Sequence, residues 1–181
     1  MTRRISALAA VVACAGVCAG PAAASTASPA TKLCGKVSAS SVSSIIGYTV
    51  PTAVGTTVSE PASKKNDDIA FSALNCAFGA ETSIADIKKS VSVSVETLSR
   101  SLTPAELEKL VQKLHTIPGV KIKIVPYPSL GNEAYLTTFS EGGITIASLA
   151  VGSGTKVFGA TVQSASLTSK LPSLVKLAQQ L

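Results

Sequence analysis

The strictest alternation of apolar and polar residues in this chain lies at positions 89–98. Val91, Val93 and Val95 are separated by two serines, and Glu96 continues the polar series. A period of two predicts a β-strand with one face in the core and the other in water. Such strands are typical of antiparallel sheets that are covered on one side.

Further strand-like segments lie on both sides of this one. In residues 70–78, Leu74, Cys76 and Phe78 alternate onto one face, which places Cys76 on the core side. Other strands are expected at residues 54–60, 120–124, 134–139, 144–151 and 157–163. Short glycine-bearing turns join the last three of these, so we expect them to pair as an antiparallel meander.

Three segments show the spacing of amphipathic helices. The first follows Ser38, a good N-cap residue, and ends at Gly47, which suits the position after a helix. The second opens with Thr103 as the cap and Glu106 as the partner in a capping box. The third spans residues 169–181. This order of elements predicts an α+β fold, an antiparallel sheet with helices packed on one face.

The N-terminus has the organisation of an export signal. Two arginines precede an uncharged, largely apolar run over residues 5–20, and three alanines follow at 22–24. This pattern predicts a signal peptide over residues 1–24, cleaved between Ala24 and Ser25. The run is short and alanine-rich for a membrane span, which needs about 20 apolar residues. An uncleaved N-terminal anchor is the alternative.

A second alternative concerns lipidation. Cys14 follows Val-Val-Ala, which resembles a bacterial lipobox, and Cys18 is a poorer match because valine precedes it. Lipidation of Cys14 would anchor the protein to the outer face of the cytoplasmic membrane. We expect a secreted, extracellular protein, with this lipid anchor as the alternative and with membrane contact only in that case.

The rest of the chain divides into a short leader and one domain. Residues 25–33 are small, polar and contain a proline, so they are expected to form a flexible mature N-terminus. Residues 34–181 are long enough to bury a core and are expected to form a single α+β domain and a monomer.

Charge argues against one class of partner. Removing Arg3 and Arg4 with the signal lowers the basic residues from 16 to 14 against 10 acidic ones, so the net charge falls from +6 to +4. The lysines are scattered, and the chain has no tryptophan. Nucleic-acid binding requires a clustered basic face, so we expect no nucleic-acid partner.

The cysteines indicate structure rather than chemistry. Only Cys34 and Cys76 remain after removal of the signal, and exported proteins fold in an oxidising compartment. We therefore predict a Cys34–Cys76 disulfide as the single one of the fold. A reactive thiol pair is the alternative, but the chain lacks a Cys-x-x-Cys motif to favour it.

Catalytic patterns are sparse. The single histidine, His115, lies in the last turn of the second predicted helix, where it can interact with the helix dipole. No serine lies in a G-x-S-x-G motif, and one histidine with two paired cysteines cannot build a zinc site. No glycine-rich phosphate loop precedes a helix. We therefore expect no enzyme, no cofactor and no metal.

Several short motifs together resemble a family. They are Leu33-Cys34 before a serine-rich helix ending in Ile45-Ile46-Gly47, then Asn75-Cys76-Ala77-Phe78, and then Leu130-Gly131-Asn132-Glu133-Ala134-Tyr135. Over residues 33–181 the chain resembles small exported proteins and lipoproteins of actinobacteria that are classed as domains of unknown function. These are similar in plan to extracellular sensor domains of actinobacterial envelope proteins. The resemblance implies an envelope α+β domain with paired cysteines, and it carries over no catalytic residues.

The functional hypothesis follows from these observations. A well-patterned exported domain without a catalytic set is expected to be a non-enzymatic module that binds a ligand or protein of the cell envelope. The candidate surface is the polar loop at 61–68 together with the proline-bearing segment at 125–128. A secreted protease inhibitor is one alternative, and a hydrolase with an unrecognised site is another.

Overall fold

The computed structural model describes residues 28–181, apart from 65–66, 80–82, 115–119, 121 and 142. The predicted signal peptide, its cleavage site between Ala24 and Ser25, Cys14 and Cys18 lie outside the described residues. The same is true of His115. Within the described ranges, no helix is long and apolar enough to cross a membrane.

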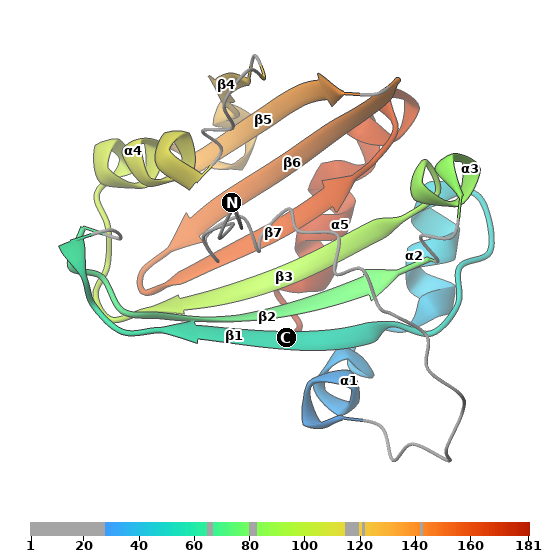
Figure 1. Cartoon of the computed structure of the whole chain (residues 1–181), viewed down its shortest axis with the longest axis horizontal. Coiled ribbons are helices and arrows are strands. Elements are labelled where there is room, and N and C mark those ends of the chain that lie inside the picture. The colour runs from blue at the N-terminus through green and yellow to red at the C-terminus, as the bar shows by residue number, and fades with distance from the viewer. Residues whose placement is uncertain (1–27, 65–66, 80–82, 115–119, 121, 142) are drawn as a thin grey trace, which may run out of the picture.

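Seven strands form one antiparallel sheet, which confirms the predicted fold class (Figure 1). They are β1 (Val54–Glu60), β2 (Phe71–Phe78), β3 (Val91–Leu98), β4 (Lys123–Pro126), β5 (Ala134–Glu141), β6 (Ile144–Ser153) and β7 (Lys156–Val162). Their order across the sheet is β1-β2-β3-β7-β6-β5-β4. The edge strands are therefore β1 and β4.

The sheet consists of two meanders. Strands β1 to β3 pair in sequence order, and so do β4 to β7. The two meanders join where β3 pairs antiparallel with β7, with Val93 opposite Ala160. The last strand of the chain thus lies at the centre of the sheet, between β3 and β6.

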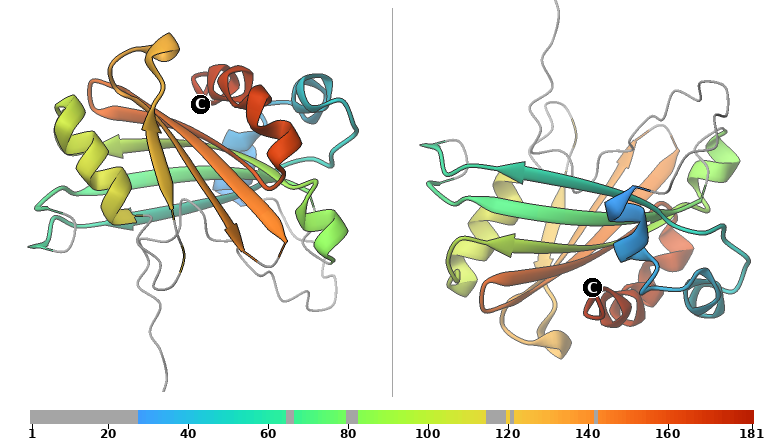
Figure 2. Two further views of the ribbon diagram at one scale, coloured as in Figure 1. Left: turned by 90° about the horizontal axis from the view of Figure 1, so that it is seen from above. Right: turned by 90° about the horizontal axis from the view of Figure 1, so that it is seen from below.

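The helices lie on both sides of the sheet. They are α1 (Pro29–Cys34), α2 (Ala39–Ile46), α3 (Ile84–Ile87), α4 (Pro104–Leu114) and α5 (Leu171–Ala178), with short 3-10 helices η3 (Pro128–Leu130) and η4 (Ala165–Lys170). Figure 1 shows α5 passing behind the central strands and α4 at the opposite end of the sheet from α2. Figure 2 shows α2 and α5 together on one side of the sheet.

The main core lies between the sheet and the helices α1, α2 and α5. The valines at 91, 93 and 95 that the alternation placed inward are all buried there. Phe78, Leu149 and Leu174 are among its largest fully buried side chains. Burying one such side chain stabilises a fold by about 1.5–3 kcal/mol, which is why these short helices persist.

Helix α4 packs against the opposite face of the sheet. Its Leu107, Leu110 and Val111 form a second buried cluster with Tyr135 and Val157. Because strand residues alternate between faces, Val157 lies on the other side from its neighbour Phe158, which belongs to the main core. The second predicted helix is therefore present, but it packs on the second face, whereas the prediction placed the helices on one face.

The predicted capping box at the start of α4 is confirmed. The Glu106 carboxylate accepts hydrogen bonds from the Thr103 backbone N–H (2.9 Å) and hydroxyl (3.0 Å). The Glu106 N–H donates to Thr103 Oγ1 (3.3 Å), and Arg100 pairs with the same carboxylate at 2.8 Å. The bond from Arg100, then those from Thr103, lower the pKa of Glu106 to about 2.

The predicted caps of α2 are also confirmed. The Ser41 N–H donates to the Ser38 hydroxyl at 3.0 Å. Gly47 has a φ of 87°, a left-handed conformation that favours glycine, and its N–H donates to Ser43 O at 2.8 Å.

Two boundaries differ from the prediction. Residues 29–33, expected to be flexible, belong to α1, because Ser28 caps it by accepting from the Thr31 N–H (3.1 Å) and Pro29 suits its first turn. The strand expected at 120–124 is β4 at Lys123–Pro126, because pairing with β5 sets its position. The short helices α3, η3 and η4 were not predicted.

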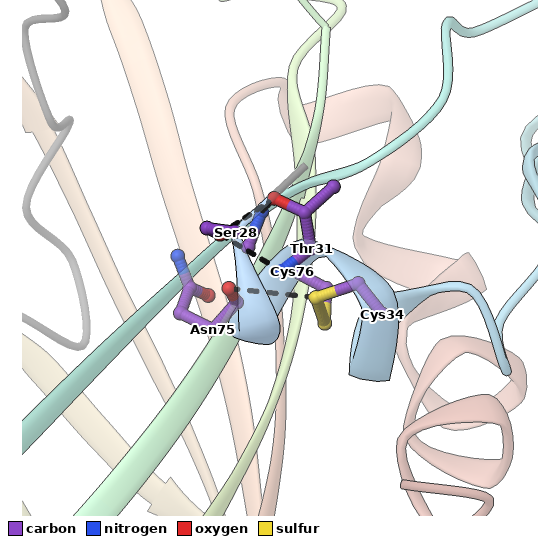
Figure 3. The surroundings of a disulfide bond; sticks show 6 residues. Ser28, Thr31, Cys34, Asn75 and Cys76 are labelled. Atoms are coloured by element: carbon purple, nitrogen blue, oxygen red, sulfur yellow. Dashed lines mark hydrogen bonds between the residues drawn. A yellow bond between two sulfur atoms is a disulfide. The ribbon is translucent and has the colours of Figure 1, made fainter. Parts of the chain in front are cut away.

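The predicted disulfide joins α1 to β2 (Figure 3). Cys34 and Cys76 have Cα atoms 5.5 Å apart and are 42 positions apart in the chain. The Gly55 N–H of the edge strand β1 also donates to Thr31 Oγ1 at 3.1 Å. A β-carbon at Gly55 would overlap the backbone of Ala30, so glycine is required for α1 to lie directly on β1.

Candidate functional site

The face of the sheet that carries α4 is polar along its middle strands. Seven polar side chains of this face are buried, although water is the expected neighbour of such groups. We call this set the polar strip, and its members are Ser90, Ser94, Glu96, Thr137, Ser148, Thr161 and Gln163. It crosses four neighbouring strands, β3, β7, β6 and β5. These lie between β2 and the edge strand β4.

Pairing register places a row of hydroxyl groups across these strands. Ser92 of β3 is opposite Thr161 of β7, Thr161 is opposite Ser148 of β6, and Ser148 is opposite Thr137 of β5. Directly paired residues point to the same face, and neighbouring strands lie about 4.8 Å apart. The row therefore presents four hydroxyl groups in a line at right angles to the strands.

Some groups in the polar strip satisfy one another. The hydroxyls of Ser148 and Thr161 are 2.8 Å apart and share one hydrogen bond. The Gln163 side-chain amide donates to the Ser90 hydroxyl at 3.3 Å. One hydroxyl can donate only one hydrogen, so the Ser148–Thr161 pair keeps one donor and several lone pairs for another partner.

Three other groups have no such partner among the residues that the structure describes. Thr137, Glu96 and Ser94 are 2%, 7% and 8% exposed. Within the described part of the chain, their side chains make no hydrogen bond or ion pair. Most buried polar side chains in proteins have a partner, and an unsatisfied one costs about 1–3 kcal/mol. Three such groups lie on one face of the sheet, and they keep hydrogen-bonding capacity for partners outside the described residues.

Glu96 is the acid of the strip. Its cross-strand neighbours are Ala73 on β2 and Val157 on β7, and Val157 belongs to the cluster under α4. Burial among these groups raises the pKa of the Glu96 carboxyl to about 7. A protonated carboxyl both donates and accepts a hydrogen bond, so near neutral pH Glu96 can serve as a donor.

The floor of the strip is built from small residues. Gly159 of β7 lies beneath the Ser94 side chain, and a β-carbon there would overlap the Ser94 hydroxyl. A β-carbon at Gly152 would lie 2.8 Å from a Glu133 carboxylate oxygen and 2.9 Å from Leu107. A larger residue at either position would therefore force these side chains to shift.

Two aromatic rings flank Thr137 on the same face of β5. Tyr135 packs under α4 and its hydroxyl donates to Pro104 O at 2.9 Å. Phe139 is buried as well, but it belongs to neither of the two clusters of described apolar residues. Ile146 on β6 lies opposite Phe139 and is half-buried. The strip thus ends in an apolar border.

The two segments of the candidate surface expected from the sequence belong to different edge strands. The loop at 61–68 follows β1, and the segment at 125–128 ends the strand β4. These two strands are the opposite edges of the sheet. Asp67 and Asp68 have φ values of 55° and 58°, as residues of a tight turn do. The two segments are therefore attached to opposite edges of the sheet.

The remaining predicted positions have structural surroundings. Cys34 and Cys76 are fully buried in the main core, on the face opposite the polar strip. Among the described residues, no group of three or more histidine, cysteine or acidic side chains could hold a metal ion.

The polar strip itself was missed by the sequence reading. Ser92, Ser94 and Glu96 were interpreted as the wet face of a strand, and one face of β3 is indeed polar. A usable signal was the matching row of serine and threonine on the predicted strands at 134–139, 144–151 and 157–163. That row becomes visible only once the pairing of β3 with β7 is known.

Comparison with known proteins assigns no family. No protein-family model matches the chain, and no curated protein matches it either.

Proposed function

We propose that this protein is an exported, non-enzymatic binding module whose ligand lies on the polar strip. The single observation that carries the proposal is the set of three buried side chains, Ser94, Glu96 and Thr137, that lack hydrogen-bond partners within the described residues. A ligand with hydroxyl or amide groups can pair with these side chains.

The export part of the proposal rests on two features. The sequence of residues 1–24 has the organisation of a signal peptide. The Cys34–Cys76 disulfide suits an oxidising compartment. The envelope location and the likeness to actinobacterial exported domains are part of the same proposal, with anchoring through Cys14 as its variant.

Binding is favoured over catalysis by the composition of the strip. Its members are hydroxyls, one amide and one carboxyl. A hydroxyl nucleophile needs a base within hydrogen-bond reach. Neither the Ser148–Thr161 pair nor the Ser90–Gln163 pair includes such a base. The groups can hold a ligand, orient it and exclude water from it.

The experiment compares Thr137→Val with Thr138→Val. Valine keeps the shape of threonine and removes the hydroxyl. Thr138 is the next residue of β5, pairs with Ala147 and points to the opposite face, so it is a matched control. The purified protein, labelled with ¹⁵N, is titrated with fractions of a cell-envelope extract, and amide shifts are mapped.

We expect shifts confined to β3, β5, β6 and β7, and we expect Thr137→Val to abolish them while Thr138→Val does not. Shifts that map to another surface, or a Thr137→Val protein that keeps the full response, would overturn the proposal.

A further inference from the structure

We infer that the open edge of β1 is an interface at which two copies of this chain pair as antiparallel strands. A two-fold axis places Val58 of one copy opposite Val58 of the other. The pairing joins two seven-stranded sheets into one continuous sheet. Such a dimer replaces the monomer expected from the sequence, and it does not involve the strands that carry the polar strip.

The two edges of the sheet differ in how they are protected from pairing with another strand. The edge strand β4 has four residues, begins with Lys123 and ends with Pro126. Natural proteins commonly block an exposed edge with a short strand, a lysine or a proline. The edge strand β1, at the lower margin of the sheet in Figure 1, has seven residues with neither lysine nor proline among them. The outer side of β1 therefore lacks the protection that β4 has.

A hydrogen bond of Gly55 shows which backbone groups of β1 point outward. Its N–H donates to Thr31 Oγ1 of α1 and therefore points away from β2. Because N–H groups alternate between the two sides of a strand, those of Thr57 and Ser59 also point away from β2. Within the described residues, no acceptor is bonded to these two N–H groups. The outer side of β1 thus keeps donors and acceptors for a further strand.

The side chains of β1 suit an added strand. Thr56 and Thr57 are exposed, and Val58 is half-buried. Residues branched at the β-carbon are enriched in strands, where they pack against cross-strand neighbours. In β1 these three residues are consecutive and uncharged. The middle of the strand can therefore approach another strand without burying a charge.

The outward groups of β1 match those of a second copy. With Val58 opposite Val58, Thr57 of each copy lies opposite Ser59 of the other. Both residues have outward N–H and C=O groups, so each of these pairs exchanges two hydrogen bonds. The two valines between them form a pair without hydrogen bonds, in which the Cα atoms are about 4.5 Å apart and the side chains contact each other.

The ends of the strand select this register. The next outward pair joins Gly55 of one copy to Pro61 of the other. The Gly55 N–H is already bonded to Thr31, and a proline has no N–H to donate. A shift of the pairing by two residues in either direction moves Gly55 or Pro61 into the ladder and leaves a C=O group of the other copy without its donor. The strand therefore pairs best with itself, which favours a second copy over an unrelated peptide.

Charge is compatible with the same register. Glu60 is the only charged residue of β1. It lies opposite Thr56 of the other copy, whose hydroxyl can donate to the carboxylate. The two Glu60 side chains lie at opposite ends of the ladder, so no like charges face each other across the interface.

The first test is a cross-link across the two-fold axis. Val58→Cys brings two thiols to a Cα separation of about 4.5 Å, close enough for a disulfide. Thr56→Cys is the matched control on the same face of β1, because its Cα lies more than about 13 Å from its counterpart in this register. The exported protein, purified with the Cys34–Cys76 bond intact, is oxidised and resolved on a non-reducing gel. We expect covalent dimers from Val58→Cys and a small fraction of them, at most about a tenth as much, from Thr56→Cys.

The second test measures the mass of the protein by sedimentation velocity. Standard interfaces bury about 1,600 Å² in total, and the short ladder of β1 buries less. We therefore expect a reversible dimer that forms between micromolar and millimolar concentration. Ser59→Pro removes an outward N–H and should weaken dimerisation at least about tenfold. Ser59→Ala keeps that N–H and should dimerise as the wild type does, although both variants lose the hydroxyl contact with Ser72.

A pair of lysine variants tests the register. Val58→Lys places two positive charges opposite each other and should weaken dimerisation at least about fivefold. Thr56→Lys places the same charge opposite Glu60 of the other copy, so its dimer should be as strong as that of the wild type or stronger. Equal weakening by the two variants would contradict the pairing of Val58 with Val58.

The inference is overturned if the wild-type protein stays monomeric at millimolar concentration, or if both cysteine variants cross-link equally. A dimer that both Ser59→Pro and Val58→Lys leave intact lies at another surface and overturns it as well. Circular dichroism shows whether Ser59→Pro keeps its fold. If it does not, the cysteine and lysine variants decide, because they retain every backbone N–H of β1.

Discussion

The two faces of the sheet differ in the side chains that they bury. The face under α1, α2 and α5 carries the main apolar core, in which the valines of β3 are buried. The other face is apolar only under α4, and beyond it carries the polar strip. Both faces are made by the same strands, so the difference lies in alternate residues and not in the backbone.

This difference separates stability from function. Apolar side chains on the first face gain free energy wherever they are buried, and they leave nothing for a ligand to complete. On the second face Ser94, Glu96 and Thr137 are buried without partners among the described residues. Such groups leave hydrogen-bonding capacity for other partners, which an apolar side chain does not.

Removing the disulfide should weaken the apolar face most. Cys34→Ser with Cys76→Ser opens a loop of 42 positions and frees α1 from β2. We expect the free energy of unfolding to fall by up to about 4 kcal/mol, because the unfolded chain gains entropy. Urea denaturation measures the loss. Reduction of the wild-type protein should lower its free energy of unfolding by a similar amount. If the oxidised, reduced and double-serine proteins have the same free energy of unfolding, the disulfide adds no stability.

Glu96 should make stability fall as pH rises. Its pKa is raised from 4.5 in the unfolded chain to about 7 in the fold, so its stabilising contribution is complete below pH 4.5. That contribution is lost as pH rises from 4.5 to 7, and amounts to at most about 3 kcal/mol. Glu96→Gln should remove this dependence in denaturation curves at several pH values.

The exposed carboxyl of Glu106 provides the opposite case. Arg100 and the Thr103 cap lower its pKa to about 2, so its contribution is present above pH 4.5 and is lost as pH falls toward 2. Glu106→Gln should therefore change stability at neutral pH and leave the loss between pH 4.5 and 7 intact. If Glu96→Gln shows the same profile as Glu106→Gln, the carboxyl of Glu96 is not buried as described.

A methyl group at Gly159 should destabilise the fold through Ser94. The added β-carbon would overlap the Ser94 hydroxyl but would lie 3.8 Å from the Ser94 β-carbon. Gly159→Ala should cost about 1–3 kcal/mol, as overpacking does. In a Ser94→Ala background the same change should cost much less, and the double-mutant cycle measures that coupling. Additive costs would contradict the close approach.

The smallest expected loss of stability concerns the N-cap of α4, the helix on the second face. Thr103→Ala removes the cap of α4 and should lower stability by about 1 kcal/mol. Thermal denaturation measures the loss, and Ser101→Ala just before the cap is the control. If Thr103→Ala were neutral, α4 would be held by its apolar contacts with Tyr135 and Val157 alone.

Local patterns in the sequence were sufficient for most elements. The alternation around Val93 specified β3, Ser38 and Gly47 bounded α2, and Thr103 with Glu106 specified the start of α4. Each of these signals acts over a few residues, through side-chain periodicity or a cap. The disulfide could be predicted because two cysteines remained outside the predicted signal.

What could not be predicted depends on contacts between distant segments. Helix α1 has only six residues and is fixed by Cys76 and by the absence of a side chain at Gly55. The strip needs Thr161 beside Ser148 and Ser92, which requires the pairing of β7 with both β6 and β3. The sequence of a strand does not reveal which strands pair with it. The serines of β3 were therefore interpreted as facing water.

The central position of β7 also has a consequence for how the chain assembles. Strands β1 to β3 are complete early in synthesis, yet β3 keeps an open edge until β7 arrives near the end of the chain. An exposed edge rich in valine invites pairing with other chains. Before the fold closes, Glu96 is hydrated and ionised at neutral pH, and a charge on such an edge opposes aggregation. We therefore expect Glu96 to protect the unfinished sheet with its charge, and Glu96→Gln chains to aggregate more during refolding at pH 7.5.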